Sequence, residues 1–242
     1  MAIQVRVPGF TPSINGLHFV NSFPHEPVVT VEIPLFGKIA IGDASGGLCG
    51  GMAFTVRDVF ETKSRAPIPD TTPPGPETPL FKYLADRLID SFDLPKAGFM
   101  KYYAWMTSPD HDTGPILVRR GLAWKTIMEE WPHRIRQSLD AGQLCVLGLV
   151  TVASVNPADL GRNHQVLAYG YDLGGSNNLT LLIYDPNTPV EQADGVRISL
   201  SLANPTMTTP ITHNVAISEP IRGFFGVDYA YRDPSAIAPI AG

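Results

Sequence analysis

The chain lacks several features that would assign a class of function directly. Only 17% of its 242 residues are charged, its net charge is −5, and Lys and Arg form no cluster. Nucleic acid and anionic membranes are therefore not expected as its main partners. No stretch approaches the ~20 apolar residues that a membrane-spanning helix needs, so no membrane span is expected.

Targeting and cofactor motifs are missing as well. No apolar run follows a basic start at the N-terminus, so we expect a cytoplasmic protein, or one exported without a cleaved signal peptide. The histidines and cysteines lack the spacing of a metal site, and the glycine-rich segments lack the Lys-Ser/Thr of a phosphate-binding loop. We therefore expect no metal and no cofactor. The sequence leaves the oligomeric state open.

Cysteine is scarce, with 2 in the chain, Cys49 and Cys145. Cys145 lies in an apolar run, 144–150, that is typical of a buried strand. A disulfide between the two would consume Cys49, whose glycine-rich surroundings favour a reactive free thiol. Two free thiols in a reducing compartment are the simpler expectation.

Cys49 stands among four glycines in the segment 46–51, which reads GGLCGG. Apolar residues at helical spacing follow it, which predicts a helix from about Cys49 to about Lys63. Free N–H groups and the positive end of the helix dipole would then favour a thiolate at Cys49. The alternative interpretation is a small buried cysteine at a glycine-rich turn.

The order of the predicted elements indicates an α+β domain, because helices come first and strands second. An extended N-terminal segment, residues 1–40, contains one strand at 28–33, and a proline-rich exposed loop occupies 64–79. Further helices are predicted after Thr78-Pro79, at 121–130 and, restarted by Pro132, to about 142, and the aromatic-rich segment 99–106 fits either a short helix or a buried connector. Strands are predicted at 143–152, 164–172, 179–185, 195–202 and 222–231. We expect a single domain over 1–242, with a mainly helical lobe at 1–142 and a mainly β lobe at 143–242.

The strands at 164–172 and 179–185 form a predicted hairpin with a two-residue turn at Gly175-Ser176. This register puts His164 opposite Asn187, and Asp185 on the same face as both. A loop that differed by one residue would turn Asp185 to the other face. Taken singly, His164 fits a strand-end histidine and Asp185 fits ordinary turn chemistry.

Together with Cys49, these residues offer a catalytic set. A thiol nucleophile needs a base to keep it ionised, and the base needs a third group to fix its tautomer. Cys49, His164 and Asp185 supply the three roles in that order along the chain.

At these residues the sequence resembles the papain-like cysteine peptidase superfamily, and most closely its bacteriocin-processing (double-glycine) peptidase-like branch. The resemblance rests on Cys49-Gly50-Gly51-Met52-Ala53-Phe54, on His164 at a strand start and on Asp185-Pro186 at the end of the next strand. It covers residues 40–190 in outline. It implies a helical lobe that carries the nucleophile helix and packs on an antiparallel β-sheet lobe. It also implies that Cys49 is the nucleophile, His164 the general base and Asp185 the orienting group, with Asn187 as a weaker candidate for orientation.

One position departs from that family. Where the superfamily usually has a glutamine that helps to bind the oxyanion, this chain has Asp43. An ionised Asp43 would repel the oxyanion, and a single lost donor costs roughly 10²–10³ in rate. Alternatively, Ser45 or backbone N–H groups fill the oxyanion hole.

The resemblance implies a cysteine-dependent hydrolase, a peptidase that acts on a peptide or protein substrate through an acyl-enzyme thioester. Two alternatives stay open: an acyltransferase or deamidase of the transglutaminase kind, and a papain-fold binding module without turnover. The departure at Asp43 is what allows the last of these.

Overall fold

The structure is a computed structural model that describes residues 2–23, 27–33, 37–43, 47–92, 98–114 and 116–241, with the backbone alone for 27–33 and 37–43. The helices are α1 (Pro12–Asn15), α2 (Cys49–Glu61), α3 (Pro79–Ser91), α4 (Gly98–Met106), α5 (Leu122–Trp124), the π-helix η1 (Lys125–Ile135), α6 (Arg136–Asp140) and the 3₁₀-helices η2 (Pro157–Arg162), η3 (Gly175–Asn177) and η4 (Val190–Gly195). The strands are β1 (Ile3–Arg6), β2 (Pro27–Ile33), β3 (Gly37–Asp43), β4 (Cys145–Val150), β5 (His164–Leu173), β6 (Asn178–Tyr184), β7 (Arg197–Ser201), β8 (Thr212–His213) and β9 (Gly223–Gly226).

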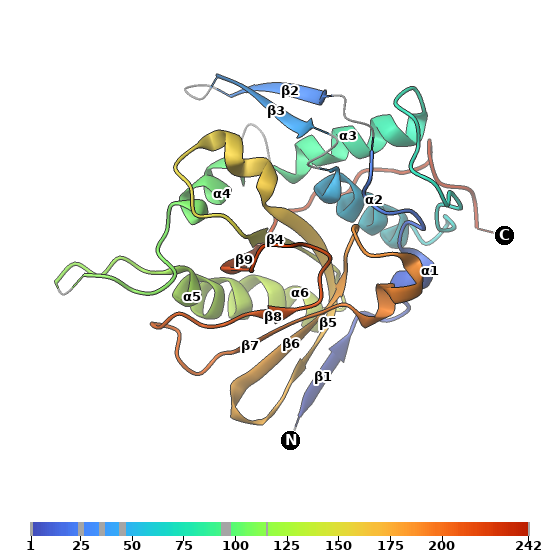
Figure 1. Cartoon of the computed structure of the whole chain (residues 1–242). Coiled ribbons are helices and arrows are strands. Elements are labelled where there is room, and N and C mark those ends of the chain that lie inside the picture. The colour runs from blue at the N-terminus through green and yellow to red at the C-terminus, as the bar shows by residue number, and fades with distance from the viewer. Residues whose placement is uncertain are drawn as a thin grey trace.

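The central element is an antiparallel sheet in the order β8-β7-β6-β5-β4-β9, which curls into a half-barrel with helices packed on it (Figure 1). β4 pairs with the first half of the long strand β5, and β1 pairs with its second half. The expectation of an α+β protein is confirmed. The later predicted strands correspond to β4, β5, β6, β7 and β9, and the predicted strand at 28–33 is β2, which pairs with β3 outside the main sheet.

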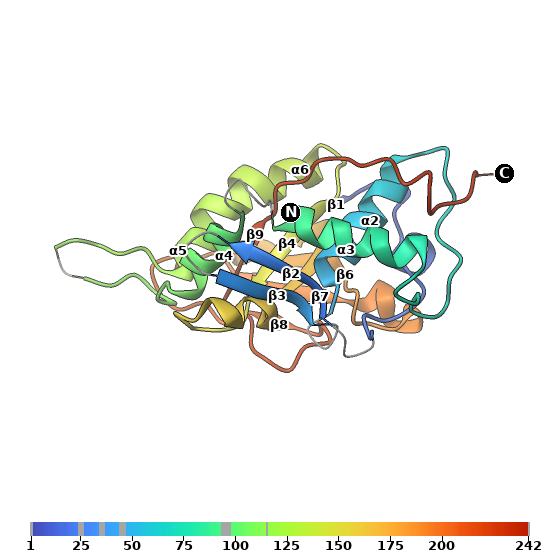
Figure 2. The same ribbon diagram turned by 90° about the horizontal axis from the view of Figure 1, so that it is seen from above.

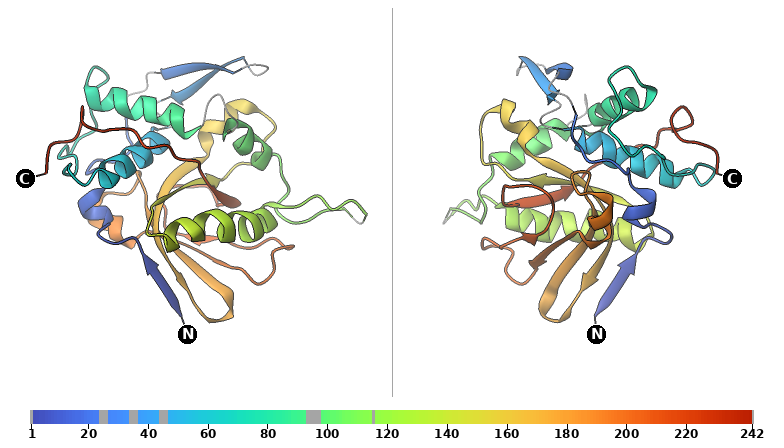
Figure 3. Two further views of the ribbon diagram at one scale, coloured as in Figure 1. Left: turned by 180° about the vertical axis from the view of Figure 1, so that it is seen from behind. Right: turned by 45° about the vertical axis from the view of Figure 1, so that its right-hand side comes forward.

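The helices lie on different parts of this sheet (Figures 2 and 3). α2 packs against α3 and β5, whereas the continuous helix from α5 through η1 to α6 packs against β9. α4 contributes aromatic rings: Tyr102 and Trp105 lie 4.6 and 4.9 Å from the ring of Phe225 on β9. Among the described residues, no helix has the length and apolar character needed to cross a lipid bilayer.

The helix around Pro132 differs from the prediction. Pro132 does not restart a helix, because it lies inside η1, whose π-helical turns continue from α5 and lead into α6. The backbone N–H of Arg136 bonds to the carbonyl of Trp131, five residues back, instead of four. This wider turn carries the chain past a residue that has no N–H to donate. The prediction of a break was wrong because it assumed α-helical spacing throughout.

Local chemistry explains how α2 and α3 start and how closely they pack. A Cβ on Gly51 would lie 2.0 Å from the Leu84 carbonyl oxygen, so only glycine lets α2 approach the α3 backbone this closely. α3 itself begins as predicted, with Pro79 in its first turn and the Thr78 hydroxyl accepting a hydrogen bond from the Phe81 N–H at 3.2 Å.

A buried ion pair joins α2 and α3 to the C-terminal segment. Asp58 and Arg87 are both fully buried, and Arg87 Nε lies 2.7 Å from Asp58 Oδ2. The hydroxyls of Tyr83 and Tyr229 and the backbone N–H of Arg232 also donate to the Asp58 carboxylate. Burial is the largest influence on the Asp58 carboxyl and raises its pKa, although Arg87 and the tyrosine hydroxyls oppose that rise. This pair therefore ties three segments distant in sequence.

The β5–β6 hairpin has the predicted pairing at its open end, although its turn differs from the predicted one. The turn is longer than two residues, and Leu173 pairs with Leu179, which is one residue out of the predicted register. A β-bulge lies between Ala168 and Gly170 and restores the register, so that Leu167 pairs with Tyr184 as predicted. The open end of the hairpin is consequently in phase with the sequence prediction.

Candidate active site

Cys49 is the first residue of α2, as the glycine pattern predicts. Its side chain lies at the end of the helix where the first N–H groups have no intrahelical acceptor and the dipole is positive. Gly47 just before it has φ +76°, and a Cβ there would lie 2.1 Å from the amide nitrogen of Asn21. The glycine therefore provides both the left-handed turn into the helix and room for Asn21. The cysteine is 6% exposed.

His164, the first residue of β5, faces Asp185 just past the end of β6. His164 Nε2 lies 2.7 Å from Asp185 Oδ1, and both side chains are buried. The predicted convergence of these two residues is therefore present. The bulge in β5 is what places them on one face, because the turn alone would have put them out of register.

Asp185 accepts three further hydrogen bonds. The N–H of Asn187 donates to Oδ1 at 3.1 Å, while the Thr188 hydroxyl and the Ala216 N–H donate to Oδ2 at 2.7 and 2.8 Å. Burial opposes ionisation, but His164 and these donors outweigh it and lower the pKa of the Asp185 carboxyl. The carboxylate is thus held both ionised and fixed in direction.

Cys49 is the second partner of the His164 ring. Because Nε2 faces Asp185, the Nδ1 side is left for the Cys49 sulfur, which interacts with the ring electrostatically and by hydrogen bonding. Burial by itself lowers the pKa of His164. The Cys49 sulfur and the Asp185 carboxylate outweigh burial and raise the pKa of His164 to about 10. The site therefore favours a protonated imidazole beside the ionised Asp185 carboxylate.

Removing the Cys49 sulfur tests how burial and the neighbouring groups together set the pKa of His164. We expect Cys49→Ala to lower the pKa of His164, because the largest contribution that raises it is lost while burial and Asp185 remain. Long-range ¹H–¹⁵N correlation spectra of the imidazole ring, recorded as a function of pH, report that pKa and the tautomer. Cys145→Ala is the matched control and should leave the His164 titration unchanged. An unchanged titration in Cys49→Ala would contradict the proposed contact.

The same shift implies a pH dependence of stability. A histidine with a pKa of about 10 when folded and ~6.5 when unfolded binds more protons in the folded state. Its stabilising contribution is therefore complete below about pH 6.5 and is lost as the pH rises toward 10. The contribution depends on Cys49, so it should be smaller in Cys49→Ala.

Asn187, the weaker candidate for orientation, has another role in the structure. Its side chain donates to the carbonyl of Ala216 at 3.1 Å and accepts from the Asn21 amide at 2.9 Å. Among the described residues its side chain has no hydrogen bond to His164. It supports the Asp185 loop instead of the ring.

Asn21 is a site residue that the sequence did not reveal. Its side-chain oxygen accepts from the Leu48 N–H at 2.6 Å, immediately before Cys49, while its amide donates to Asn187. Its own N–H bonds to the carbonyl of Pro186 at 2.9 Å. Asn21 therefore links the turn before α2 to the loop that carries Asp185. Nothing distinguishes it locally from an ordinary loop asparagine, so no sequence signal marks it.

A second set of polar groups lies behind the first turn of α2. Gln165 donates to the Ser91 hydroxyl at 3.1 Å, and a Cβ on Gly50 would lie 2.4 Å from Ser91 Oγ and 2.8 Å from Gln165 Oε1. Burial and the nearby Cys49 sulfur raise the pKa of Tyr102 well above its usual value, so its hydroxyl keeps its proton. No sequence signal marks this layer, because Gln165 meets Ser91 only when α3 packs against α2.

The two oxyanion-hole candidates can be placed only in part. Asp43 is the last residue of β3, and its backbone pairs with Pro27, but its side chain is outside the described residues. Ser45 lies outside them altogether. The backbone N–H of Cys49, at the start of α2, is a helix-start donor with no intrahelical acceptor.

The described residues hold no cluster of three or more His, Cys, Asp or Glu side chains that could bind a metal ion. Both cysteines are free, Cys145 lying on β4 away from the hairpin end. The chemistry that this arrangement offers is that of a thiol beside an imidazole that a carboxylate orients.

Comparisons of the chain with models of protein families, with curated proteins and with solved structures found no match.

Proposed function

We propose that this protein is a papain-like cysteine hydrolase that acts on an amide bond of a peptide or protein. The observation that carries the proposal is the Cys49–His164–Asp185 arrangement, in which a helix-start thiol faces a histidine bonded to a buried, four-fold hydrogen-bonded carboxylate. A histidine that merely filled the core would not need a carboxylate held in this way. The helices and the antiparallel sheet are compatible with the two lobes of that family.

The reaction follows from the charges at the site. The Cys49 thiolate attacks the amide carbonyl carbon, and the N–H groups at the start of α2 stabilise the oxyanion that forms. His164 gives its proton to the departing amine, which leaves Cys49 as a thioester. Water then attacks the thioester as His164 takes its proton, the carboxylic acid leaves and the thiolate–imidazolium pair returns. Asp185 holds the ring so that one nitrogen faces the sulfur throughout.

Selective alkylation tests the nucleophile. We expect iodoacetamide at pH 7 to modify Cys49 at least about 100-fold faster than Cys145, because the thiolate is the reacting species. Burial raises the pKa of Cys145 to about 11, so little of it is ionised at neutral pH. Peptide mass spectrometry of the native protein after timed quenching gives both rate constants.

The chain provides its own controls for that measurement. His164→Ala should slow Cys49 alkylation toward the rate of an ordinary thiol, and urea-unfolded protein should show similar rates at both cysteines. Equal, slow labelling of the two thiols in the folded protein would remove the proposal. A screen of peptide, amide and ester electrophiles against wild type and Cys49→Ala would then identify the substrate class, and its products would separate hydrolysis from deamidation or acyl transfer.

A papain-fold binding module is the second candidate function. The observation in its favour is that Cys49 is only 6% exposed, which restricts approach to the sulfur. A module predicts that electrophilic peptides bind without forming a covalent adduct. An enzyme predicts an adduct at Cys49 that His164→Ala suppresses.

A further inference from the structure

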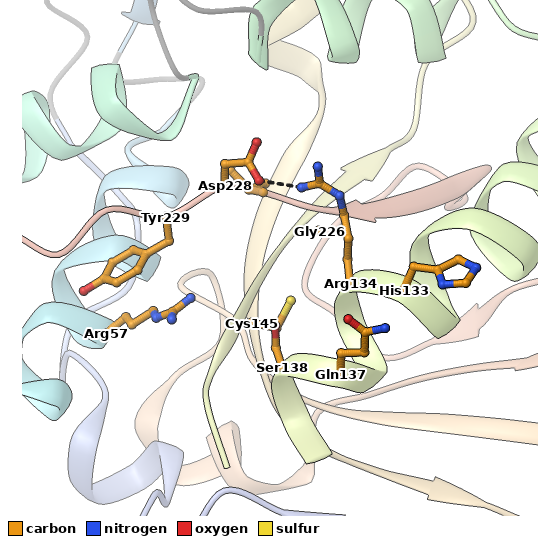
Figure 4. A pocket seen from close by; sticks show the side chains of 10 residues that line it. Arg57, His133, Arg134, Gln137, Ser138, Cys145, Gly226, Asp228 and Tyr229 are labelled. Atoms are coloured by element: carbon orange, nitrogen blue, oxygen red, sulfur yellow. Dashed lines mark hydrogen bonds and ion pairs between the residues drawn. The ribbon is translucent and has the colours of Figure 1, made fainter. Parts of the chain in front are cut away.

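A cavity of about 290 Å³ lies between α2 and the η1–α6 helix, and His164 is not among its lining residues (Figure 4). Its walls come from α2, from the η1–α6 helix, from the start of β4 and from the chain that follows β9. The lining side chains include Arg57, Arg134, Gln137, Ser138, Cys145 and Tyr229. Cys145 opens β4, whereas Leu149, four residues later, pairs with His164, so the cavity is a separate site.

Arg57 is a preorganised donor in this cavity. Its side chain is 12% exposed, its Nε bonds to Glu61 at 2.7 Å, and its guanidinium carbon lies 3.8 Å from the centre of the Tyr229 ring. Within the described part of the chain, neither Nη atom of Arg57 has a hydrogen-bond partner. A nearly buried guanidinium with two free, parallel N–H groups matches the two oxygens of a carboxylate or phosphate.

A second cation faces Arg57 across the cavity. Arg134, on η1, pairs with Asp228 on the chain after β9, as the dashed line in Figure 4 marks. The two side chains are 46% and 69% exposed. An exposed pair of this kind contributes little to stability, so Arg134 can exchange Asp228 for another anion at small cost.

Two uncharged groups, the Cys145 thiol and the Ser138 hydroxyl, line the cavity, and the nearby buried Glu130 carboxylate is paired with Lys101 at 2.7 Å. Burial raises the pKa of Cys145 to about 11, and the thiol also interacts with the Ser138 hydroxyl. At physiological pH this surface therefore presents a protonated thiol and a hydroxyl. Neither repels an anion, and the hydroxyl is a hydrogen-bond donor.

We propose that this cavity binds a small molecule through a carboxylate or phosphate group, with Arg57 as the bidentate donor and Arg134 as the second cation. The volume suits a compact metabolite and is too small for an extended peptide. The ligand is therefore distinct from the substrate proposed for Cys49, and the inference does not depend on that proposal. Arg57 and Cys49 both lie on α2.

Isothermal titration calorimetry with inorganic phosphate and with glutarate tests the site, and glutaramide serves as the uncharged control. We expect saturable binding of at least one anion and none of glutaramide. Arg57→Gln should weaken binding at least about 10-fold, because it removes the charged bidentate contact. Asp228→Asn should strengthen it, because Arg134 is then released to the ligand. Arg136→Gln, which removes an exposed arginine outside the cavity, is the matched control and should leave binding unchanged.

Opposite effects of the Arg57 and Asp228 variants cannot come from loss of folding, and circular dichroism checks the fold of each. Cys49→Ala should bind the anion as wild type does. Absence of saturable binding would overturn the proposal. So would binding that Arg57→Gln leaves unchanged, or binding that Cys49→Ala abolishes, since the last result would place the anion at the thiol.

Discussion

Asp185→Asn is expected to lower the rate constant for acylation of Cys49 by a peptidyl electrophile by roughly 10³–10⁴-fold. The reason is the wrong histidine tautomer. The Ala216 N–H and the Thr188 hydroxyl both donate to Oδ2 of Asp185, so the oxygen of an asparagine amide will take that position. The NH₂ group must then face Nε2 of His164, which forces that nitrogen to accept and leaves the proton on Nδ1, toward Cys49.

The measurement is a single-turnover acylation rate, with ring ¹⁵N shifts to identify the tautomer. Asp172→Asn makes the same chemical change at a partly exposed carboxylate that pairs with Arg6, and it should leave the rate unchanged. A well-folded Asp185→Asn protein with a wild-type rate would show that the carboxylate does not orient His164. Full loss of structure would instead be visible by circular dichroism, and Thr188→Val, which removes one donor only, would then be the milder test.

Arg87→Met is expected to lower the free energy of unfolding at pH 7 by about 3–5 kcal/mol. The substitution leaves the fully buried Asp58 carboxylate without its cation, while methionine fills most of the space. The two tyrosine hydroxyls and the Arg232 N–H remain but carry no full charge. Urea denaturation followed by circular dichroism measures the loss.

The pH dependence identifies the cause. Arg87 lowers the pKa of Asp58, so its removal raises that pKa further above the unfolded value of ~3.9. The folded variant then binds more protons than the unfolded chain, and its deficit should shrink as the pH falls from 7 toward 4. Arg136→Met, at an exposed pair with Asp140, should cost no more than ~1 kcal/mol. A double variant with Asp58→Asn should cost less than the sum of the single variants, and strict additivity would argue against a coupled pair.

The parts of the fold that were predictable rest on local chemistry. The helix starts at Cys49 and Thr78 follow from glycine spacing and from capping residues, and the strands follow from apolar runs. His164 and Asp185 were predictable as partners because a hairpin brings them together within 21 residues of chain. Each of these depends on residues that are close in sequence.

The parts that were not predictable depend on distant residues. Asn21 meets Leu48 and Asn187 only because the N-terminal segment folds over both, and Gln165 meets Ser91 only when α3 packs in place. The π-helical path through Pro132 arises where this helix packs along β9. Helix propensity alone would have predicted a break at the proline. Tertiary packing determines these features, and the residues adjacent in sequence do not indicate them.

The bulge between Ala168 and Gly170 shows that the site depends on whether the number of residues added to or removed from the hairpin is odd or even. Side chains alternate along a strand, so whether His164 and Asp185 meet depends on whether the hairpin between them gains or loses an odd number of residues. The longer turn contributes one such change and the bulge contributes the other, so the two cancel. A lineage could therefore lengthen or shorten this turn and keep the site, provided that each step is matched by a gain or loss of a bulge. In an alignment, a gap in the turn between Leu173 and Leu179 should therefore be matched by a gap at the bulge, because a single gap would exchange the inner and outer faces of the strand.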